Sequence, residues 1–160
     1  MTTEEQVKII IEKAQISDLL TRYFAAVDDK RLDKKIAEAT FSKDAEIVRP
    51  DDVVIIGPDN IFNAHKKSFD RFKATHHLFS NFLIDISSDN ATLRANLIAN
   101  HIWKGNEDDP SLEGKYFLAD GVFYAKAKKN DNTWLICELR NQVVWRTGDG
   151  MAEMIKSIKQ

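Results

Sequence analysis

The chain has 160 residues, of which 43% are hydrophobic and 30% are charged, and 25 acidic against 23 basic side chains give a net charge of −2. This length and composition predict a single globular domain over residues 1–160. The sequence shows no basic stripe and only short apolar runs, so neither nucleic acid nor a membrane is an expected partner.

The N-terminus and the cysteine content bear on the compartment. The first residues lack the basic segment and apolar core of a signal peptide. The single cysteine, Cys137, excludes an intramolecular disulfide, and its apolar neighbours indicate a buried, inert thiol. These features favour a cytoplasmic protein.

The first half of the chain is expected to be mainly helical. Residues 4–27 carry apolar side chains at steps of three and four, which form one face of a helix. Gly57-Pro58 is typical of a helix start, and that helix is expected to run through Phe72. The other elements expected in this half are a short helix over 33–40 and two short strands over 45–49 and 53–56.

The second half is expected to form a sheet. Residues 91–103 alternate between a small or apolar phase, which includes His101, and a more polar phase, as in an antiparallel strand with two different faces. Helices followed by consecutive strands predict an α+β fold with an antiparallel sheet. The four long strands are expected over 75–86, 91–103, 115–126 and 134–145, before a C-terminal helix over 151–158.

Three of the four histidines lie in the first two of these strands, where acid–base chemistry can be placed: His76, His77 and His101. Neighbours in a strand face opposite sides, so His76 and His77 make a poor metal chelate and no metal site is expected. Periodicity alone would bury His76, because it shares its phase with Leu78, Phe82 and Ile84.

Several short motifs occur in an order and spacing that resemble the SnoaL-like family of the cystatin-like, nuclear transport factor-like superfamily. The resemblance spans about residues 5–146 and implies a cone, in which a strongly curved antiparallel sheet wraps around the N-terminal helices. The motifs are Tyr23-Phe-Ala-Ala-Val-Asp28, Thr75-His-His77 with Asn81, Asp89-Asn-Ala91-Thr, His101, Gly114-Lys-Tyr116 and Trp134-Leu-Ile136.

The resemblance implies a set of catalytic residues. Asp28 matches the aspartate at the end of the first helix in the family's dehydratases, and His77 matches the histidine four residues before the family's asparagine. His101 matches the second sheet histidine of scytalone dehydratase, and Tyr23 matches a tyrosine of bile-acid dehydratase. Tyr23 and Asp28 lie about 140° apart on a regular helix, so the helix must end or bend for both to face one pocket. The residues expected to contact a substrate are His76, Asn81, Ala99, Tyr116 and Asn141.

The expected function is that of a cofactor-independent lyase, cyclase or isomerase acting on a hydrophobic, oxygenated small molecule such as a polyketide, steroid or terpenoid. A histidine would remove a proton, and His101 or Tyr23 would donate one to the leaving group. The alternatives are a non-catalytic small-molecule-binding module and the small subunit of an aromatic-ring dioxygenase. Catalysis requires Asp28 close to a sheet histidine at a cavity, whereas a cavity filled by aromatic side chains would favour the alternatives.

The outer face of the sheet is expected to form a homodimer interface. The strand phase that contains Ile98 and Ile102 would leave apolar surface on the convex side of a curved sheet.

Overall fold

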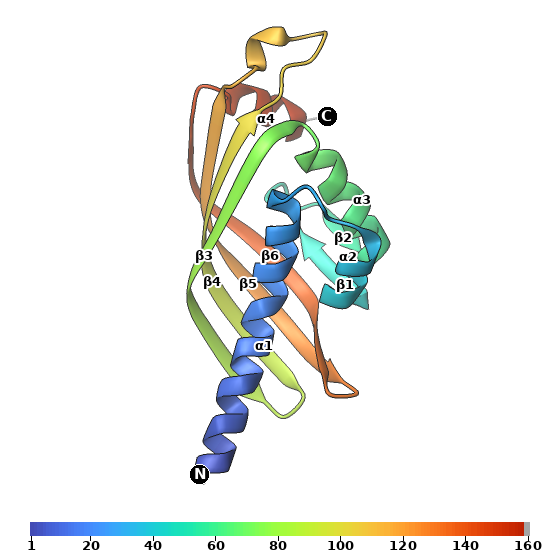
Figure 1. Ribbon diagram of the computed structural model, residues 1–160, viewed down its shortest axis with the longest axis vertical. Coiled ribbons are helices and arrows are strands. Elements are labelled where there is room, and N and C mark those ends of the chain that lie inside the picture. The colour runs from blue at the N-terminus through green and yellow to red at the C-terminus, as the bar shows by residue number, and fades with distance from the viewer. Residues whose placement is uncertain (159–160) are drawn as a thin grey trace.

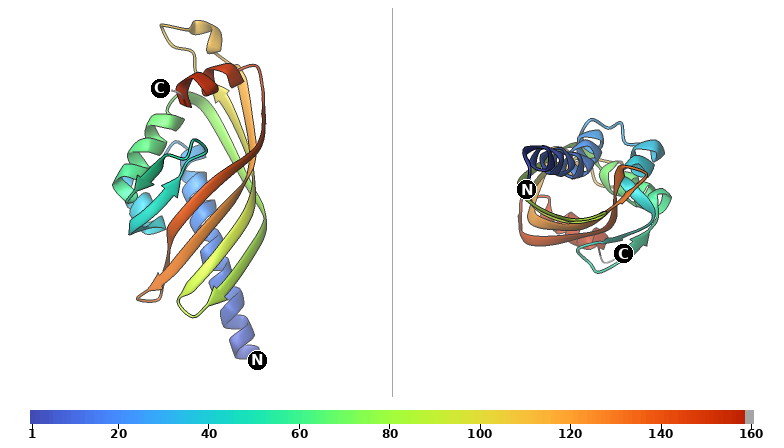
Figure 2. Two further views of the ribbon diagram at one scale, coloured as in Figure 1. Left: turned by 180° about the vertical axis from the view of Figure 1, so that it is seen from behind. Right: turned by 90° about the horizontal axis from the view of Figure 1, so that it is seen from below.

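The computed structural model describes residues 1–158, in which helices α1, α2 and α3 pack on one side of a curved six-stranded sheet (Figure 1). Strands β3 to β6 are consecutive and antiparallel, and the order across the sheet is β2-β1-β6-β5-β4-β3. The α+β class and the antiparallel arrangement of the last four strands are therefore confirmed. Seen end on, the sheet is curved but does not close (Figure 2).

The long first helix, α1 (Thr3–Asp28), begins at a capping box, in which the Thr2 hydroxyl accepts from the backbone of Glu5 and the Glu5 carboxylate accepts from that of Thr2. Its C-terminal half buries an apolar stripe against the sheet, whereas its N-terminal end projects beyond the sheet (Figure 1). The helix stays regular up to Asp28 and then stops. Lys30 follows in the left-handed region, at a φ of 57°, with the hydrogen bonds of a helix-terminating motif around it.

The third helix ends earlier than the sequence indicated. It stops at Phe69, and Phe72, expected in the helix, is the first residue of β3. The Lys30 ammonium donates to the carbonyl oxygens of both Phe69 and Phe72, at 3.2 and 3.1 Å. A cation at the C-terminal carbonyls of a helix is favourable, so the end of α1 helps to fix the end of α3.

The remaining elements agree with the predicted order. Five of the six strands are longer than expected, and the strand expected over 53–56 is one residue shorter. No helix within residues 1–158 is long and apolar enough to cross a membrane. The elements are α2 (Lys34–Thr40), β1 (Phe41–Val48), β2 (Val54–Ile56), α3 (Pro58–Phe69), β3 (Phe72–Ser87), β4 (Asn90–Trp103), a short 3-10 turn (Pro110–Leu112), β5 (Tyr116–Asn130), β6 (Thr133–Thr147) and α4 (Met151–Ile158).

A bulge in β3 decides which histidine faces the helices. The pairing of β3 with β4 shifts between Ser80 and Leu83, and Asn81 between them has a φ of 52°. A bulge changes the phase of a strand, so the inward residues His77 and Phe79 precede it and the buried Ile84 follows it. The apolar phase that contains His76 in the sequence is therefore split between the two faces.

Candidate active site

Asp28 and His77 form a hydrogen-bonded pair between the end of α1 and strand β3. The His77 ring nitrogen Nδ1 lies 2.7 Å from Asp28 Oδ1, and the His77 backbone N–H donates to Oδ2 at 2.8 Å. The hydroxyl of the buried Thr75 also donates to Oδ1, at 2.8 Å. A carboxylate accepts hydrogen bonds, so the hydrogen of His77 lies on Nδ1 and its Nε2 is left as the basic atom.

The environment of Asp28 keeps the carboxyl ionised. Burial raises its pKa, but the hydrogen bonds from His77 and Thr75, together with the charge of a protonated His77, outweigh this effect and bring the pKa below the ordinary value of 3.8. The side chain of Asp28 is 15% exposed and that of His77 is 2% exposed. An ionised aspartate behind a buried imidazole orients the ring and stabilises the imidazolium that forms when Nε2 takes a proton.

His101 lies beside this pair on strand β4, with its ring centroid 5.5 Å from that of His77. Its Nδ1 is 3.1 Å from the carbonyl oxygen of Phe117, which can only accept, so Nδ1 carries the hydrogen. Burial lowers the pKa of His101 to about 4, and the charge of His77 acts in the same direction. Neutral His101 thus offers an acceptor at Nε2 rather than the proton of an imidazolium.

Tyr23 is hydrogen-bonded to His65, a histidine that the sequence did not indicate as a site residue. Its hydroxyl lies 2.8 Å from Nδ1 of His65 on helix α3, and Tyr23 is fully buried. Burial raises the pKa of Tyr23 and lowers that of His65 to about 4, so both groups are neutral. In the sequence, the neighbouring Lys66 and Lys67 favour an exposed His65. The available signal was its spacing of four residues from both Ile61 and Phe69, on the apolar face of α3.

The two polar pairs contact different elements. Tyr23 reaches α3, whereas Asp28 reaches β3, as the angle between them on α1 requires. The ring of Phe24 lies between the pairs, with its centroid 4.8 Å from that of His77 and 6.2 Å from that of His65. One helix therefore presents an acid–base pair and a tyrosine to the interior without any bend.

Aromatic rings cover the pair. The Phe69 ring lies 5.3 Å from that of His77 and is stacked on His101 at 6.2 Å, and Phe79 and Phe123 surround Phe24. Phe69 is the last residue of α3, and its ring contacts both histidines, whereas His101 is also in contact with the rings of Phe72 and Phe117.

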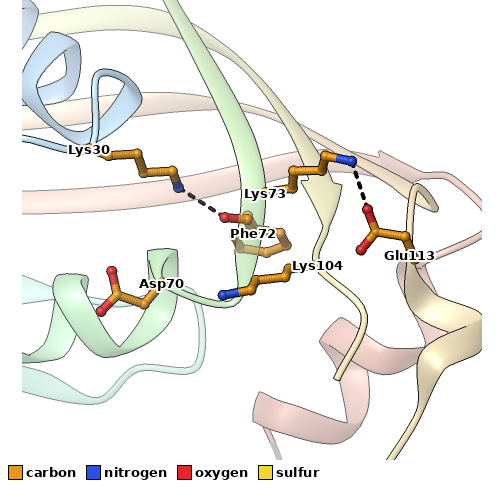
Figure 3. A pocket seen from close by; sticks show the side chains of 6 residues that line it. All are labelled: Lys30, Asp70, Phe72, Lys73, Lys104 and Glu113. Atoms are coloured by element: carbon orange, nitrogen blue, oxygen red, sulfur yellow. Dashed lines mark hydrogen bonds and ion pairs between the residues drawn. The ribbon is translucent and has the colours of Figure 1, made fainter. Parts of the chain in front are cut away.

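Two hollows lie near this aromatic cluster, and neither has Asp28 or His77 in its wall. The lysine hollow, of about 440 Å³, is lined by Lys30, Asp70, Phe72, Lys73, Lys104 and Glu113 (Figure 3). The ring of Phe72 separates this hollow from His101, since the two rings are 4.7 Å apart. The arginine hollow, of about 490 Å³, lies between the end of β1, the second half of β6 and α4; its wall includes Arg49, Asn141, Val143, Arg146, Met151 and Ile155.

The residues expected to bind substrate are spread over both faces of the sheet. His76, Asn81 and Tyr116 are exposed. Ala99 lies directly opposite His77 and is buried. Asn141 lines the arginine hollow, and its buried Oδ1 has no hydrogen-bond partner in the described part of the chain. In residues 1–158, no group of three or more His, Cys, Asp or Glu side chains is placed to hold a metal ion.

Solved structures share this architecture at low sequence identity. Hexachlorocyclohexane dehydrochlorinase LinA-type3 from Novosphingobium barchaimii LL02 is 18% identical, with a TM-score of 0.75 over 89% of this chain and 93% of that one. A protein from Novosphingobium aromaticivorans DSM 12444, described as a candidate scytalone dehydratase, is 20% identical, with a TM-score of 0.76 over 89% and 90%. A protein of unknown function with a cystatin-like fold from Nostoc punctiforme is 18% identical, with a TM-score of 0.65 over 83% and 91%.

The helices packed on one side of a curved, open sheet define a cystatin-like α+β domain. The sequence model of the SnoaL-like domain matches residues 9–140. The chain therefore belongs to the SnoaL-like family. A search of curated proteins gave no match.

Proposed function

We propose that this protein is a cofactor-independent acid–base enzyme that catalyses an elimination or isomerisation, with His77 as the base and Asp28 as its orienting partner. The observation that carries the proposal is the 2.7 Å contact between His77 Nδ1 and Asp28 Oδ1, which leaves Nε2 as a proton acceptor. Two proteins of similar fold have names that describe eliminations, a dehydrochlorinase and a candidate dehydratase.

In the proposed reaction, Nε2 of His77 takes a proton from a carbon next to a carbonyl group. The electron pair of that C–H bond forms a C=C bond as the C–O bond to a hydroxyl group breaks. The hydroxide leaves as water after it receives a proton. Tyr23 is the candidate donor, because its hydroxyl is un-ionised, and Phe24, which lies between Tyr23 and His77, must move aside for this transfer. The aromatic surroundings suit a hydrophobic, oxygenated substrate such as a polyketide, steroid or terpenoid.

A panel of β-hydroxy ketones of these three classes, followed by mass spectrometry for loss of water, tests the proposal. Asp28→Asn keeps the size of the side chain but removes its charge, so the rate should fall by about 10²–10⁴. His77→Ala should lose as much, and the double variant little more, because the two residues act as one unit. Asp29→Asn, at an exposed aspartate paired with Arg31, is the matched control and should leave the rate unchanged. Losses that multiply in the double variant would contradict the pair.

The aromatic cover over His77 favours a second candidate, a binding module for hydrophobic small molecules that has no chemistry. If a ligand from the same panel binds to the wild type and to Asp28→Asn with equal affinity but is never converted, the second candidate is the better one.

A further inference from the structure

Arg146 lies in line with His77 across the concave face of the sheet. His77 on β3 is directly opposite Ala99 on β4, Ala99 is opposite Ala119 on β5, and Ala119 is opposite Arg146 on β6. Directly opposed residues of antiparallel strands project their side chains to the same face. The row therefore has a base at one end, a cation at the other, and two small side chains between them.

Arg146 is a half-buried cation that has no hydrogen-bond acceptor among residues 1–158. Of the arginines around the arginine hollow, Arg49 is paired with Asp51 at 2.9 Å and Arg140 with Asp52 at 3.4 Å. For Arg146, no hydrogen bond or ion pair occurs within the part of the chain that the structure describes. A guanidinium presents its donors in a fixed fork that matches a carboxylate, so its natural partner is an anion from outside the chain.

The rest of the hollow suits a molecule that is both apolar and polar. Val143, Met151 and Ile155 provide apolar wall, and Asn141 provides a polar side chain, whose Oδ1 is buried and has no hydrogen-bond partner among residues 1–158. Arg49, in the wall of the same hollow, also lowers the pKa of His65, after the larger effects of burial and of the charge of His77.

We propose that Arg146 binds the carboxylate of an apolar carboxylic acid whose body lies over Ala119 and Ala99 and whose acidic C–H bond reaches His77. The row spans three strand spacings, roughly 14 Å between the terminal Cα atoms, and both end side chains extend inward and shorten this gap. The body of the ligand is thus limited to about one or two fused rings, and Phe69 must move aside from His77 for it to enter. This assignment rests on the proposed function, because it takes His77 as the reacting group.

The test compares 1-naphthaleneacetate with 1-naphthaleneacetamide, which has nearly the same shape but no charge, by isothermal titration calorimetry on the full chain. The acetate should bind at least tenfold more tightly than the amide. Arg146→Gln should remove this preference, whereas Arg94→Gln, at a half-buried arginine on the opposite face of the sheet, should retain it. Thermal unfolding of each variant checks that it is folded.

Equal binding of the two probes, no binding of either, or equal losses in both variants would overturn the assignment of Arg146. Asp28→Asn separates this result from the proposed function, since it should keep the preference for the acetate while it lowers turnover. Loss of turnover in Asp28→Asn together with an unchanged preference in Arg146→Gln would reject the carboxylate site and leave the enzyme proposal intact.

Discussion

Thr75 supports the acid–base pair at the scale of a single residue. Its buried hydroxyl supplies one of the three hydrogen bonds that Asp28 accepts. Thr75→Val keeps the shape of the side chain and removes this donor, so urea unfolding at pH 7 should show a loss of about 1–3 kcal/mol. Thr75→Ser retains the hydroxyl and should recover most of that loss. A valine variant as stable as the wild type would show that the two bonds from His77 satisfy the carboxylate alone.

Two neutral histidines, the buried His101 and the half-buried His65, make the fold sensitive to mild acid. His65 and His101 have a folded pKa of about 4, below their ordinary value of 6.5, so between these values the unfolded chain binds protons that the folded chain does not. The free energy of unfolding should therefore fall as the pH drops from 6.5 toward 4, by on the order of 1–2 kcal/mol per histidine at pH 5.

Urea unfolding at pH 7.5 and at pH 5 measures this loss. His65→Phe, in surroundings that already contain Tyr23, Phe24 and Phe69, should reduce the loss by about half. The exposed His76 provides the control, since His76→Gln should leave the loss unchanged. A pH dependence that His65→Phe does not alter would contradict the assignment.

At this scale the sequence predicted only part of the candidate site. Asp28, His77 and Tyr23 could be named because they match a family motif, whereas periodicity alone favoured His76. The reason is the bulge at Asn81, which has no clear sign in the alternation of apolar residues. The sequence did not indicate Arg146 as a site residue, because its position opposite Ala119 depends on strand pairing that a single sequence does not specify.

Among the elements, β3 is the strand whose register depends on the backbone conformation of one residue, Asn81. Asn81 has a φ of 52°, which asparagine and glycine adopt readily and β-branched residues do not. Asn81→Gly should match or slightly exceed wild-type stability, whereas Asn81→Val should cost at least about 1–2 kcal/mol in chemical unfolding.

Asn100→Val, in a regular part of β4 opposite His76, is the control and should be tolerated. If Asn81→Val also weakens the His77–Asp28 pair, the ring resonances of His77 in NMR spectra should shift. An Asn81→Val protein with unchanged stability and spectra would mean that the bulge does not fix the register.

The elements themselves were largely predictable, because apolar periodicity and turn residues act locally. The end of α3 could not be predicted from the local sequence. It depends on Lys30, which lies about 40 residues earlier in the chain and donates to the carbonyl groups of Phe69 and Phe72. A contact of this kind is set by the tertiary fold, and local propensity indicated a longer helix.

For the whole molecule, we propose a homodimer formed through the convex face of the sheet. Leu78, Ile98, Asp120 and Trp145 lie opposite one another in a row on this face, and the three apolar members are 43–47% exposed. Ile98→Glu should convert the dimer to a monomer in light scattering at micromolar concentration, because it places a second negative charge directly opposite Asp120.

Ile10→Glu is the matched control, because it changes an isoleucine that is 66% exposed in the N-terminal half of α1. It should leave the assembly unchanged. A monomeric wild type, or equal dissociation by both substitutions, would contradict a dimer through the sheet.

The hydrogen bond from the His77 backbone N–H to Asp28 also protects an edge of the sheet. Strand β3 is at the edge of the sheet, where free N–H and C=O groups invite a strand from another chain. Asp28 Oδ2 accepts a hydrogen bond from the backbone N–H of His77, so this N–H is not available to pair with a strand of another chain. The amide oxygen of an asparagine at this position would still accept the N–H of His77, whereas alanine would leave this N–H unpaired at the sheet edge and favour aggregation. A relative that has lost all catalysis would therefore still benefit from a hydrogen-bond acceptor here, and an aspartate at this position is not by itself a sign of an enzyme.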